Sequence, residues 1–191
     1  MDPATIFIPL AAIGIGVQSW EEDLASKVVL AKDEAAQSLF GRPWDELLPS
    51  EAEVVLNWYR PLGELQRQLT YERQHSRAYS TYVDKMTREA GIRTEKRLPI
   101  PLQKAMKEAK VGLGPIPYRF GNWQLNENRY RRYQDLIVEQ LKVMTPVVTG
   151  EKWKRMPLVG RQQVLEEIIR TARAQAKDRL IAELVQQRKR R

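Results

Sequence analysis

The chain has 191 residues, a length that fits one domain or two small ones. It contains no cysteine and a single histidine, His75, which excludes disulfide scaffolds, thiolate zinc sites, iron–sulfur clusters, cysteine nucleophiles and multi-histidine metal sites. With 32 Lys and Arg against 24 Asp and Glu, the net charge is +8, which favours an anionic partner without proving one.

The charge is unevenly distributed along the chain. Residues 1–59 carry 3 basic and 10 acidic side chains, a net charge of −7, whereas residues 60–150 carry +8 and residues 151–191 carry +7. One interpretation is that the acidic patch meets a basic surface of a neighbouring subunit. The other is that acidic and basic helices of one monomer pack together, and charge balance alone does not separate the two.

Residues 3–17 are apolar, Pro or Gly apart from Thr5. The run is shorter than the roughly 20 residues of an ordinary membrane-spanning helix, and acidic Asp2 stands where a signal peptide has basic residues. It is interpreted either as a terminus buried on the body or a neighbouring subunit, or as a membrane-active segment. The candidate assembly or membrane contacts are Ile6, Phe7, Ile8, Leu10, Ile13, Ile15 and Trp20.

The next segments have helical periodicity. Apolar residues recur at helical spacing from Trp20 to Leu39, and Gly41 predicts the end of this helix. Ser50 with Glu53 three residues later matches a capping box and predicts the start of a second helix.

Proline and glycine recur in the middle of the chain, where they interrupt the helical pattern. Pro61 predicts a break near Arg60, and Gly91 is the expected end of the helix that precedes it. Residues 91–123 are predicted to form a Pro/Gly-rich extended arm with one short helix at 101–110, and no run alternates clearly enough to predict a strand.

The residue pattern of the C-terminal part predicts two long helices. Asn126 is a good cap for the first, and the second runs from Arg161 to Arg188 with a narrow face at Ala172 and Ala176. We therefore expect an all-α fold with long helices, a Pro/Gly-rich extended arm and a C-terminal helical hairpin. The expected domains are an N-terminal apolar segment with acidic-to-basic helices at 1–90, the arm at 91–123, and the hairpin with its basic tail at 124–191.

No pattern of catalytic residues is visible. His75 has no partner in a recognisable triad, and the glycines of VGLGP lack the lysine and hydroxyl of a phosphate-binding loop. We expect no catalytic residue, no metal ligand and no cofactor, and hence a protein that is not an enzyme.

Two basic stretches are candidate contacts for anions or nucleic acids. The first interleaves its arginines with Tyr130 and Tyr133, which suits phosphate neutralisation and base stacking. The tyrosines are also spaced i, i+3 within the apolar stripe, which favours core packing instead. The second stretch is the basic C-terminal tail. The candidate residues are Arg129, Arg131, Arg132, Arg188, Lys189, Arg190 and Arg191.

Residues 124–184 resemble a helical module near the C-termini of large bacteriophage virion-associated proteins of the internal or ejection type. In that module a capped helix with tyrosines leads through a short turn to a last helix. The matching residues are Leu125, Tyr130, Tyr133, Leu136, Trp153, Met156, Pro157, Arg161, Leu165, Ile168, Ile169, Ala172, Arg173, Ala176 and Lys177. The opening MDPATIFIPLAAIGIG is similar to the openings of some phage internal or ejection proteins. The resemblance implies a virion component and supplies no catalytic residues.

The leading hypothesis is a bacteriophage structural protein of the virion interior or portal–tail region, acting through protein–protein assembly and DNA ejection. The implied location is the virion, and the host cytoplasm during assembly. The implied partners are other virion proteins, further copies of the chain, DNA, and a host membrane through residues 3–17. Charge reversal of Arg161, Arg170 and Arg173 is expected to weaken assembly in a salt-sensitive way. The alternatives are a nonspecific nucleic-acid-binding helical protein and a membrane-active terminus.

Overall fold

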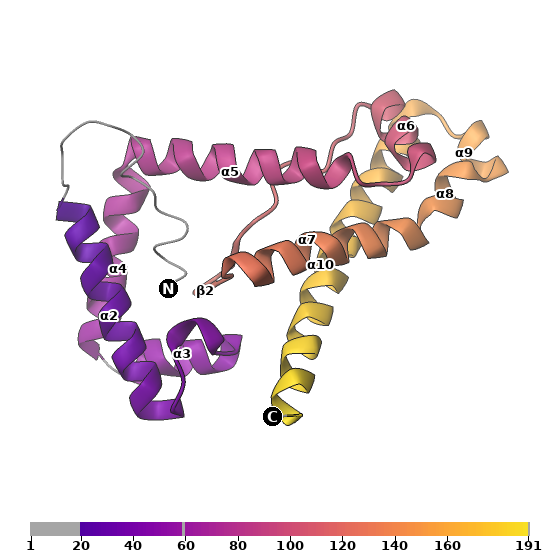
Figure 1. Ribbon diagram of the computed structural model, residues 1–191. Coiled ribbons are helices and arrows are strands. Elements are labelled where there is room, and N and C mark those ends of the chain that lie inside the picture. The colour runs from indigo at the N-terminus through magenta and orange to yellow at the C-terminus, as the bar shows by residue number, and fades with distance from the viewer. Residues whose placement is uncertain (1–19, 59, 191) are drawn as a thin grey trace. The chain divides into compact units, whose positions relative to one another are not determined.

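The computed structural model describes residues 20–58 and 60–190, and in that part of the chain the fold is all-α, as the periodicity predicts (Figure 1). The chain divides into two compact units. Unit 1 comprises the described residues up to Asp84 together with residues 118–128, and unit 2 comprises residues 85–117 together with the described residues from Arg129 onward.

This division differs from the three consecutive segments expected from composition, because neither unit is continuous in sequence. The chain leaves unit 1 within a helix and returns for residues 118–128, where Tyr118 and Leu125 are buried. The backbone amide of Leu125 donates to the carbonyl of Tyr118 over 2.8 Å and closes this returning loop. The Pro/Gly-rich segment is therefore shared between the two units rather than forming an arm of its own.

Unit 1 is built on helices that pack around two small apolar clusters. Its elements are α2 (Trp20–Phe40), the 3₁₀ turn η2 (Trp44–Glu46), α3 (Pro49–Trp58) and α4 (Arg60–His75). Helix α2 packs against both α3 and α4. The larger cluster consists of Ala36, Leu47, Ala52, Val55, Leu56 and Leu62, and the smaller one of Leu24, Ala25, Val28 and Leu69.

Two of the predicted helix boundaries in unit 1 are confirmed, and a third is wrong. Helix α2 ends at Phe40 before Gly41, whose positive φ of 63° suits glycine, and α4 begins two residues after α3 ends, as Pro61 predicts. The predicted cap at Ser50 is wrong, because the capping residue is Leu48, two residues earlier. Helix α3 begins at Pro49, and the carboxylate of Glu51 accepts from the amide of Leu48 over 2.8 Å, because proline is pre-organised for the first helical position.

Residues 118–125 contain a short strand pair that the sequence patterns did not predict. Strands β1 (Arg119–Phe120) and β2 (Trp123–Gln124) pair antiparallel around a tight turn in which Gly121 has a φ of 60°. Strands of two residues are too short to show an alternating pattern. The hairpin contacts α3 and so forms part of unit 1.

Helix α5 (Arg77–Glu95) passes through Gly91, so the prediction that this glycine ends the helix is wrong. Gly91 is buried, and a Cβ atom at this position would clash with the backbone carbonyl of Gly114. The glycine is thus required by a close backbone approach from a distant part of the chain, which a local pattern does not show.

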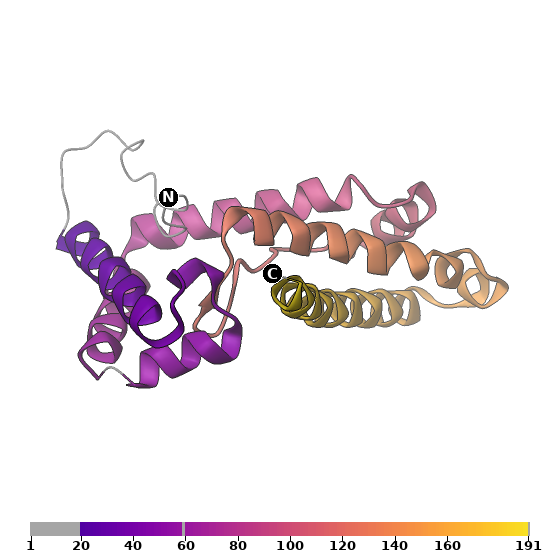
Figure 2. The same ribbon diagram turned by 60° about the horizontal axis from the view of Figure 1, so that its bottom comes forward.

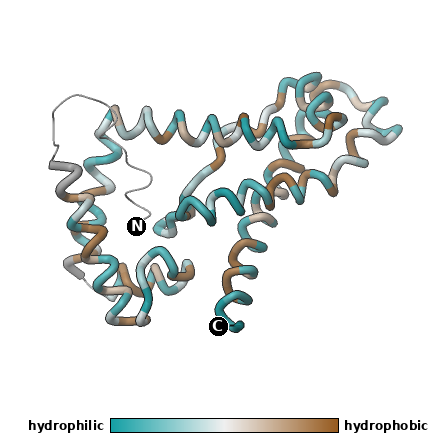
Figure 3. Tube along the Cα trace, viewed as in Figure 1, coloured by the Kyte–Doolittle hydropathy of each residue, from teal (hydrophilic) through white to brown (hydrophobic). Residues whose placement is uncertain are grey.

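The remaining helices form unit 2. They are α6 (Ile100–Ala109), α7 (Glu127–Val143), α8 (Thr145–Thr149), α9 (Glu151–Arg155) and α10 (Leu158–Lys189). Helix α6 packs against both α8 and α10 (Figure 2). The apolar residues of α10 appear as brown bands separated by teal, and its C-terminal end is teal (Figure 3). The largest fully buried side chains of unit 2 are Leu102, Met106, Ile116, Tyr133, Leu136, Ile137, Leu141, Leu165 and Leu180.

The two long C-terminal helices are not joined by a tight turn. The short helices α8 and α9 occupy most of residues 144–157 between them. None of the helices described has both the length and the apolar character needed to cross a membrane.

Candidate functional site

The two tyrosines of the basic stretch on α7 belong to the core of unit 2. Tyr130 and Tyr133 are both buried, and the hydroxyl of Tyr130 donates to the carbonyl of Ile116 over 2.8 Å. Burial raises the pKa of both phenols, to about 12 for Tyr133. This confirms the packing interpretation, and neither ring is exposed for stacking on a base.

Arg132 is held by carboxylates within unit 2. Its Nε and Nη2 donate to the two oxygens of Glu183 over 2.9 and 2.7 Å, and its Nη1 donates to Glu139 over 2.9 Å. The hydrogen bonds from Arg132 lower the pKa of Glu183, and those to Glu183 raise the pKa of Arg132. Arg179 joins the network through a 2.8 Å ion pair with Glu139. These pairs weaken the case for Arg132 as a phosphate contact.

The ion pairs also join α7 to the C-terminal half of α10, and these two helices carry the two basic stretches. On α7, Arg131 is exposed and Arg129 is half-buried. On α10, Lys189 and Arg190 are exposed and Arg188 is half-buried, whereas Arg191 lies outside the described residues. These five described cations remain the candidate anion contacts of unit 2.

The candidate contacts at the N-terminus lie largely outside the described residues. Trp20 is the first residue of α2, and the structure does not describe the other members of the set, Ile6, Phe7, Ile8, Leu10, Ile13 and Ile15.

Two arginines that were expected to serve assembly are instead tied to backbone carbonyls. Nη2 of Arg173 donates to the carbonyls of Leu113 and Pro115, the latter over 3.0 Å, and burial lowers the pKa of this guanidinium. Arg161 donates to the carbonyls of Trp153 and Met156 over 3.1 and 3.0 Å at the end of α9. Reversing either charge would disrupt unit 2 itself.

Arg170 is the third arginine that was expected to serve assembly, and it makes an ion pair on the surface of its own helix. Its side chain is 78% exposed and pairs with Glu167 on the same helix. A charge reversal that tests assembly therefore cannot include Arg161 or Arg173, because a loss of assembly would report on folding.

The net charge is divided between the two units. The sequence segments of unit 1, residues 1–84 and 118–128, carry 8 basic and 14 acidic side chains, a net charge of −6. Those of unit 2, residues 85–117 and 129–191, carry 24 basic and 10 acidic side chains, a net charge of +14. The basic character of the protein thus belongs to unit 2 alone.

Several aliphatic side chains of unit 2 are exposed on helices that gather at one end of the unit, and we call this region the aliphatic end. Helices α6 and α8, the C-terminal end of α7 and the first turns of α10 gather there in both views, together with the short helix α9 (Figures 1 and 2). The members are Ile100 (79% exposed), Val143 (73%), Val147 (44%), Leu158 (51%) and Val159 (63%). Exposed lysines and an arginine stand on α6 and on α9, at Lys104, Lys107, Lys152, Lys154 and Arg155. Exposed apolar residues with charged neighbours are typical of protein–protein contact surfaces.

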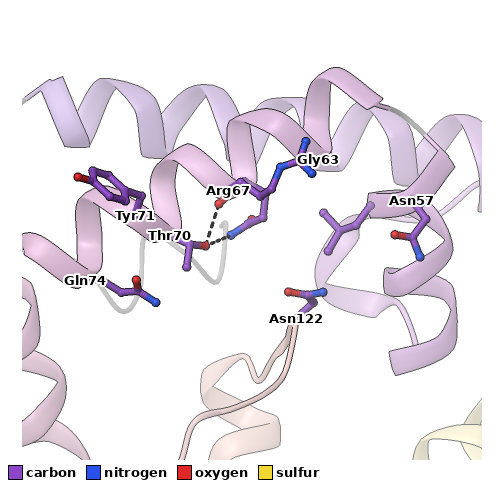
Figure 4. A pocket seen from close by; sticks show the side chains of 9 residues that line it. Asn57, Gly63, Arg67, Thr70, Tyr71, Gln74 and Asn122 are labelled. Atoms are coloured by element: carbon purple, nitrogen blue, oxygen red, sulfur yellow. Dashed lines mark hydrogen bonds between the residues drawn. The ribbon is translucent and has the colours of Figure 1, made fainter.

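Unit 1 contains a groove along α4, which we call the amide groove (Figure 4). It consists of two adjoining pockets of about 430 and 330 Å³ that share Gln66, Thr70 and Gln74. These three residues follow one another at i, i+4 and i+8, so they lie on one face of the helix. The first pocket is completed by Leu56, Asn57, Gly63, Arg67, Tyr71 and Asn122, and the second by Arg73, Tyr79, Ser80, Val83, Asp84 and Arg119.

Hydrogen bonds fix the orientation of Gln66 in the groove. The hydroxyl of Thr70 donates to the carbonyl of Gln66 over 2.8 Å, so its oxygen is left to accept, and Nε2 of Gln66 donates to it over 3.2 Å. The amide oxygen Oε1 of Gln66 is buried and has no hydrogen-bond partner among the described residues. The groove therefore contains an acceptor that lacks a donor.

The wall of the second pocket includes the aromatic ring of Tyr79, which has two close neighbours. The hydroxyls of Tyr79 and Tyr118 lie 2.6 Å apart, and burial is the main cause that raises the pKa of Tyr118. The guanidinium of Arg73 lies 4.7 Å from the centre of the Tyr79 ring, and its buried Nε finds no acceptor in the part of the chain that is described. Sequence reasoning missed this groove, although the polar i, i+4, i+8 stripe of α4 was a visible signal.

His75 lies at the surface of unit 1. The residue is exposed, its Nδ1 lies 2.7 Å from the carbonyl of Tyr71, and the two rings stack with centres 4.2 Å apart. Within residues 20–58 and 60–190, no three carboxylate or histidine side chains converge to hold a metal ion.

No family model, no curated protein and no solved structure matches the chain.

Proposed function

We propose that the protein is a structural component of a bacteriophage particle, in the virion interior or portal–tail region, which acts by assembling with other virion proteins and with further copies of itself. The proposal combines the resemblance of residues 124–184 to phage virion-associated proteins with one structural observation. That observation is the aliphatic end of unit 2.

The aliphatic end supports a contact role because exposed aliphatic side chains gain free energy when they leave water. Burying apolar surface contributes about 25 cal/mol per Å². Five such side chains come from four helices that meet at one end of a unit whose other large aliphatic residues are mostly buried. A partner that covers them buries a substantial apolar surface.

The charge of the surroundings indicates which partner fits. Unit 2 carries +14 and unit 1 carries −6, so the acidic unit 1 of a second copy complements the basic helices around the aliphatic end. An acidic surface on another virion protein has the same chemistry. Association of this kind weakens as salt screens the charges.

The test is the absolute mass of the nuclease-treated protein by light scattering on a sizing column, at low and high salt. We expect a discrete multiple of the monomer mass at low salt that dissociates at high salt. Changing Val143 and Val159 together to serine is expected to leave a monomer at low salt. The matched control, Ile92→Ser, removes an exposed aliphatic side chain from α5 and is expected to assemble normally.

A wild-type monomer at both salt concentrations contradicts self-assembly. Assembly that the double variant leaves intact contradicts the role of the aliphatic end.

A second function, nonspecific nucleic-acid binding, is favoured by the net charge of +14 on unit 2 and by the basic end of α10. Neutralising phosphates with Lys and Arg releases counterions, so affinity falls steeply with salt. Changing Lys189, Arg190 and Arg191 to glutamine is expected to reduce the slope of log K against log salt by up to about 2.7, at about 0.9 for each lost phosphate contact.

The matched control changes Lys27, Lys32 and Arg42 of the acidic unit 1 to glutamine and is expected to leave that slope unchanged. Equal slopes for both triple variants, measured on duplex DNA by fluorescence anisotropy, contradict a specific role for the end of α10.

A further inference from the structure

We propose that the amide groove of unit 1 is a binding site for an oligosaccharide. The inference is independent of the assembly function, because it rests on the side chains of the groove and not on the aliphatic end of unit 2.

The first argument is the unpartnered acceptor in the groove. Thr70 fixes the amide of Gln66 so that its buried Oε1 points away from the internal hydrogen bonds. A buried polar atom without a partner costs free energy that a suitable ligand recovers. A ligand that presents an O–H or N–H group to Gln66 would supply the missing donor.

The second argument is the chemistry of the lining. Primary amides come from Asn57, Gln66, Gln74 and Asn122, which contribute both donors and acceptors to the first pocket (Figure 4). Sugar hydroxyls also donate and accept at the same atom, so they match such a lining from many orientations. No carboxylate lines this first pocket.

The third argument is an aromatic platform. Tyr71 is 60% exposed at the edge of the first pocket, and its ring is steadied by the stacked ring of His75. The face of an aromatic ring is electronegative and attracts the C–H groups that a sugar ring presents on its own face.

The size of the groove suits a chain rather than a single sugar. From Gly63 to Gln74 the rise of α4 amounts to roughly 16 Å, at 1.5 Å per residue. The two adjoining pockets extend beyond this to Ser80 and Val83.

Two other ligand classes fit less well. A polyanion such as a nucleic acid is disfavoured by the net charge of −6 on unit 1, although three arginines line the groove. Two of these are engaged, because Arg73 stacks on Tyr79 and Nε of Arg119 donates to the carbonyl of Gly121 over 3.1 Å. An amphipathic helix is disfavoured because Leu56 and Val83 are the only aliphatic side chains in the lining.

The experiment is a titration of the full-length, ¹⁵N-labelled protein followed through its side-chain amide resonances. The probes are two neutral chains, chitotetraose and maltotetraose, and one acidic chain, tetragalacturonate. All three present hydroxyl groups, so the comparison distinguishes which class of oligosaccharide binds. We expect shifts at the amides of Gln66, Gln74 and Asn122 with at least one probe, and none at Gln68, which is exposed on the same helix outside the groove.

Variants test the atom that carries the proposal. Gln66→Leu removes the acceptor and is expected to weaken binding about tenfold, whereas the matched control Gln68→Leu leaves the dissociation constant unchanged. Tyr71→Ala provides a second test at an exposed position that does not support the core. Circular dichroism and thermal unfolding establish that each variant is folded.

Three results would overturn the proposal. They are no amide shift with any of the three probes, shifts that Gln66→Leu and Tyr71→Ala leave unaltered, and shifts in the groove with oligothymidylate in place of the sugars. None of these results bears on the mass of the assembly, so the two proposals fail separately.

Discussion

The two units differ in what their polar side chains do. In the basic unit 2, long cationic side chains hold the fold together: Arg173 joins α10 to the loop at 113–115, and Arg132 joins α7 to α10 through Glu183. In the acidic unit 1, apolar clusters hold the helices, and the polar face of α4 lines an open groove. A count of charges would assign function to unit 2, yet several of its cations are structural.

This difference shows that an arginine is evidence for an anionic partner only after its internal partners are known. Arg132, Arg161 and Arg173 all contribute to the net charge of +14, and each already has carbonyl or carboxylate partners within unit 2. The polar atoms that are left for a ligand include Gln66 Oε1, a neutral group in the acidic unit. Neutral residues therefore carry the best-defined candidate site.

The largest expected effect tests the claim that unit 2 depends on one close backbone approach. Gly91→Ala places a methyl group against the carbonyl of Gly114 and is expected to destabilise unit 2 by about 3 kcal/mol. Hydrogen exchange is expected to accelerate in α6 and α10 and to stay unchanged in α2 and α3. The matched control is Gly160→Ala, where the added atom meets the flexible side chain of Met156. Faster exchange in both units would contradict their independence.

A smaller effect is expected from the arginine that holds the 113–115 loop. Arg173→Met keeps much of the side-chain volume but removes the donors to two carbonyls, and is expected to lower the free energy of unfolding by about 2 kcal/mol. Arg170→Met, three residues earlier and exposed, is expected to change it by less than about 0.5 kcal/mol. If urea unfolding gives the same loss of free energy for both variants, the contacts of Arg173 with the 113–115 loop do not stabilise the fold.

The smallest effect concerns the ion-pair network and depends on pH. Because the folded-state pKa of Glu183 is lowered, its contribution to stability is present above its ordinary pKa of 4.5 and disappears as the pH falls through the folded-state value. Glu183→Gln is expected to cost about 1 kcal/mol at neutral pH, since the pair is partly exposed. The wild type and the variant are expected to converge in acid.

Chemical unfolding at a series of pH values measures this convergence. The control is Glu166→Gln at an exposed position of α10, which is expected to change stability little at any pH. A cost for Glu183→Gln that persists in strong acid would contradict the electrostatic origin.

Local patterns were enough to predict the all-α fold, the end of α2 at Gly41, the break near Arg60 and the packing of Tyr130 and Tyr133. Each of these depends on residues within one or two helical turns, where side-chain spacing and backbone preference act directly. A short stretch of the sequence is therefore enough to predict these features.

The candidate sites depended on contacts between distant parts of the chain. Arg173 finds its carbonyl partner at Leu113, 60 residues away, and Gly91 is required by Gly114 rather than by a helix end. The first pocket of the amide groove is completed by the returning segment 118–124, which packs against α3 and brings Asn122 into the lining beside Gln66 and Gln74. Helical periodicity determines which face of a helix is polar, whereas tertiary packing decides whether that face is covered, paired or left open to a ligand.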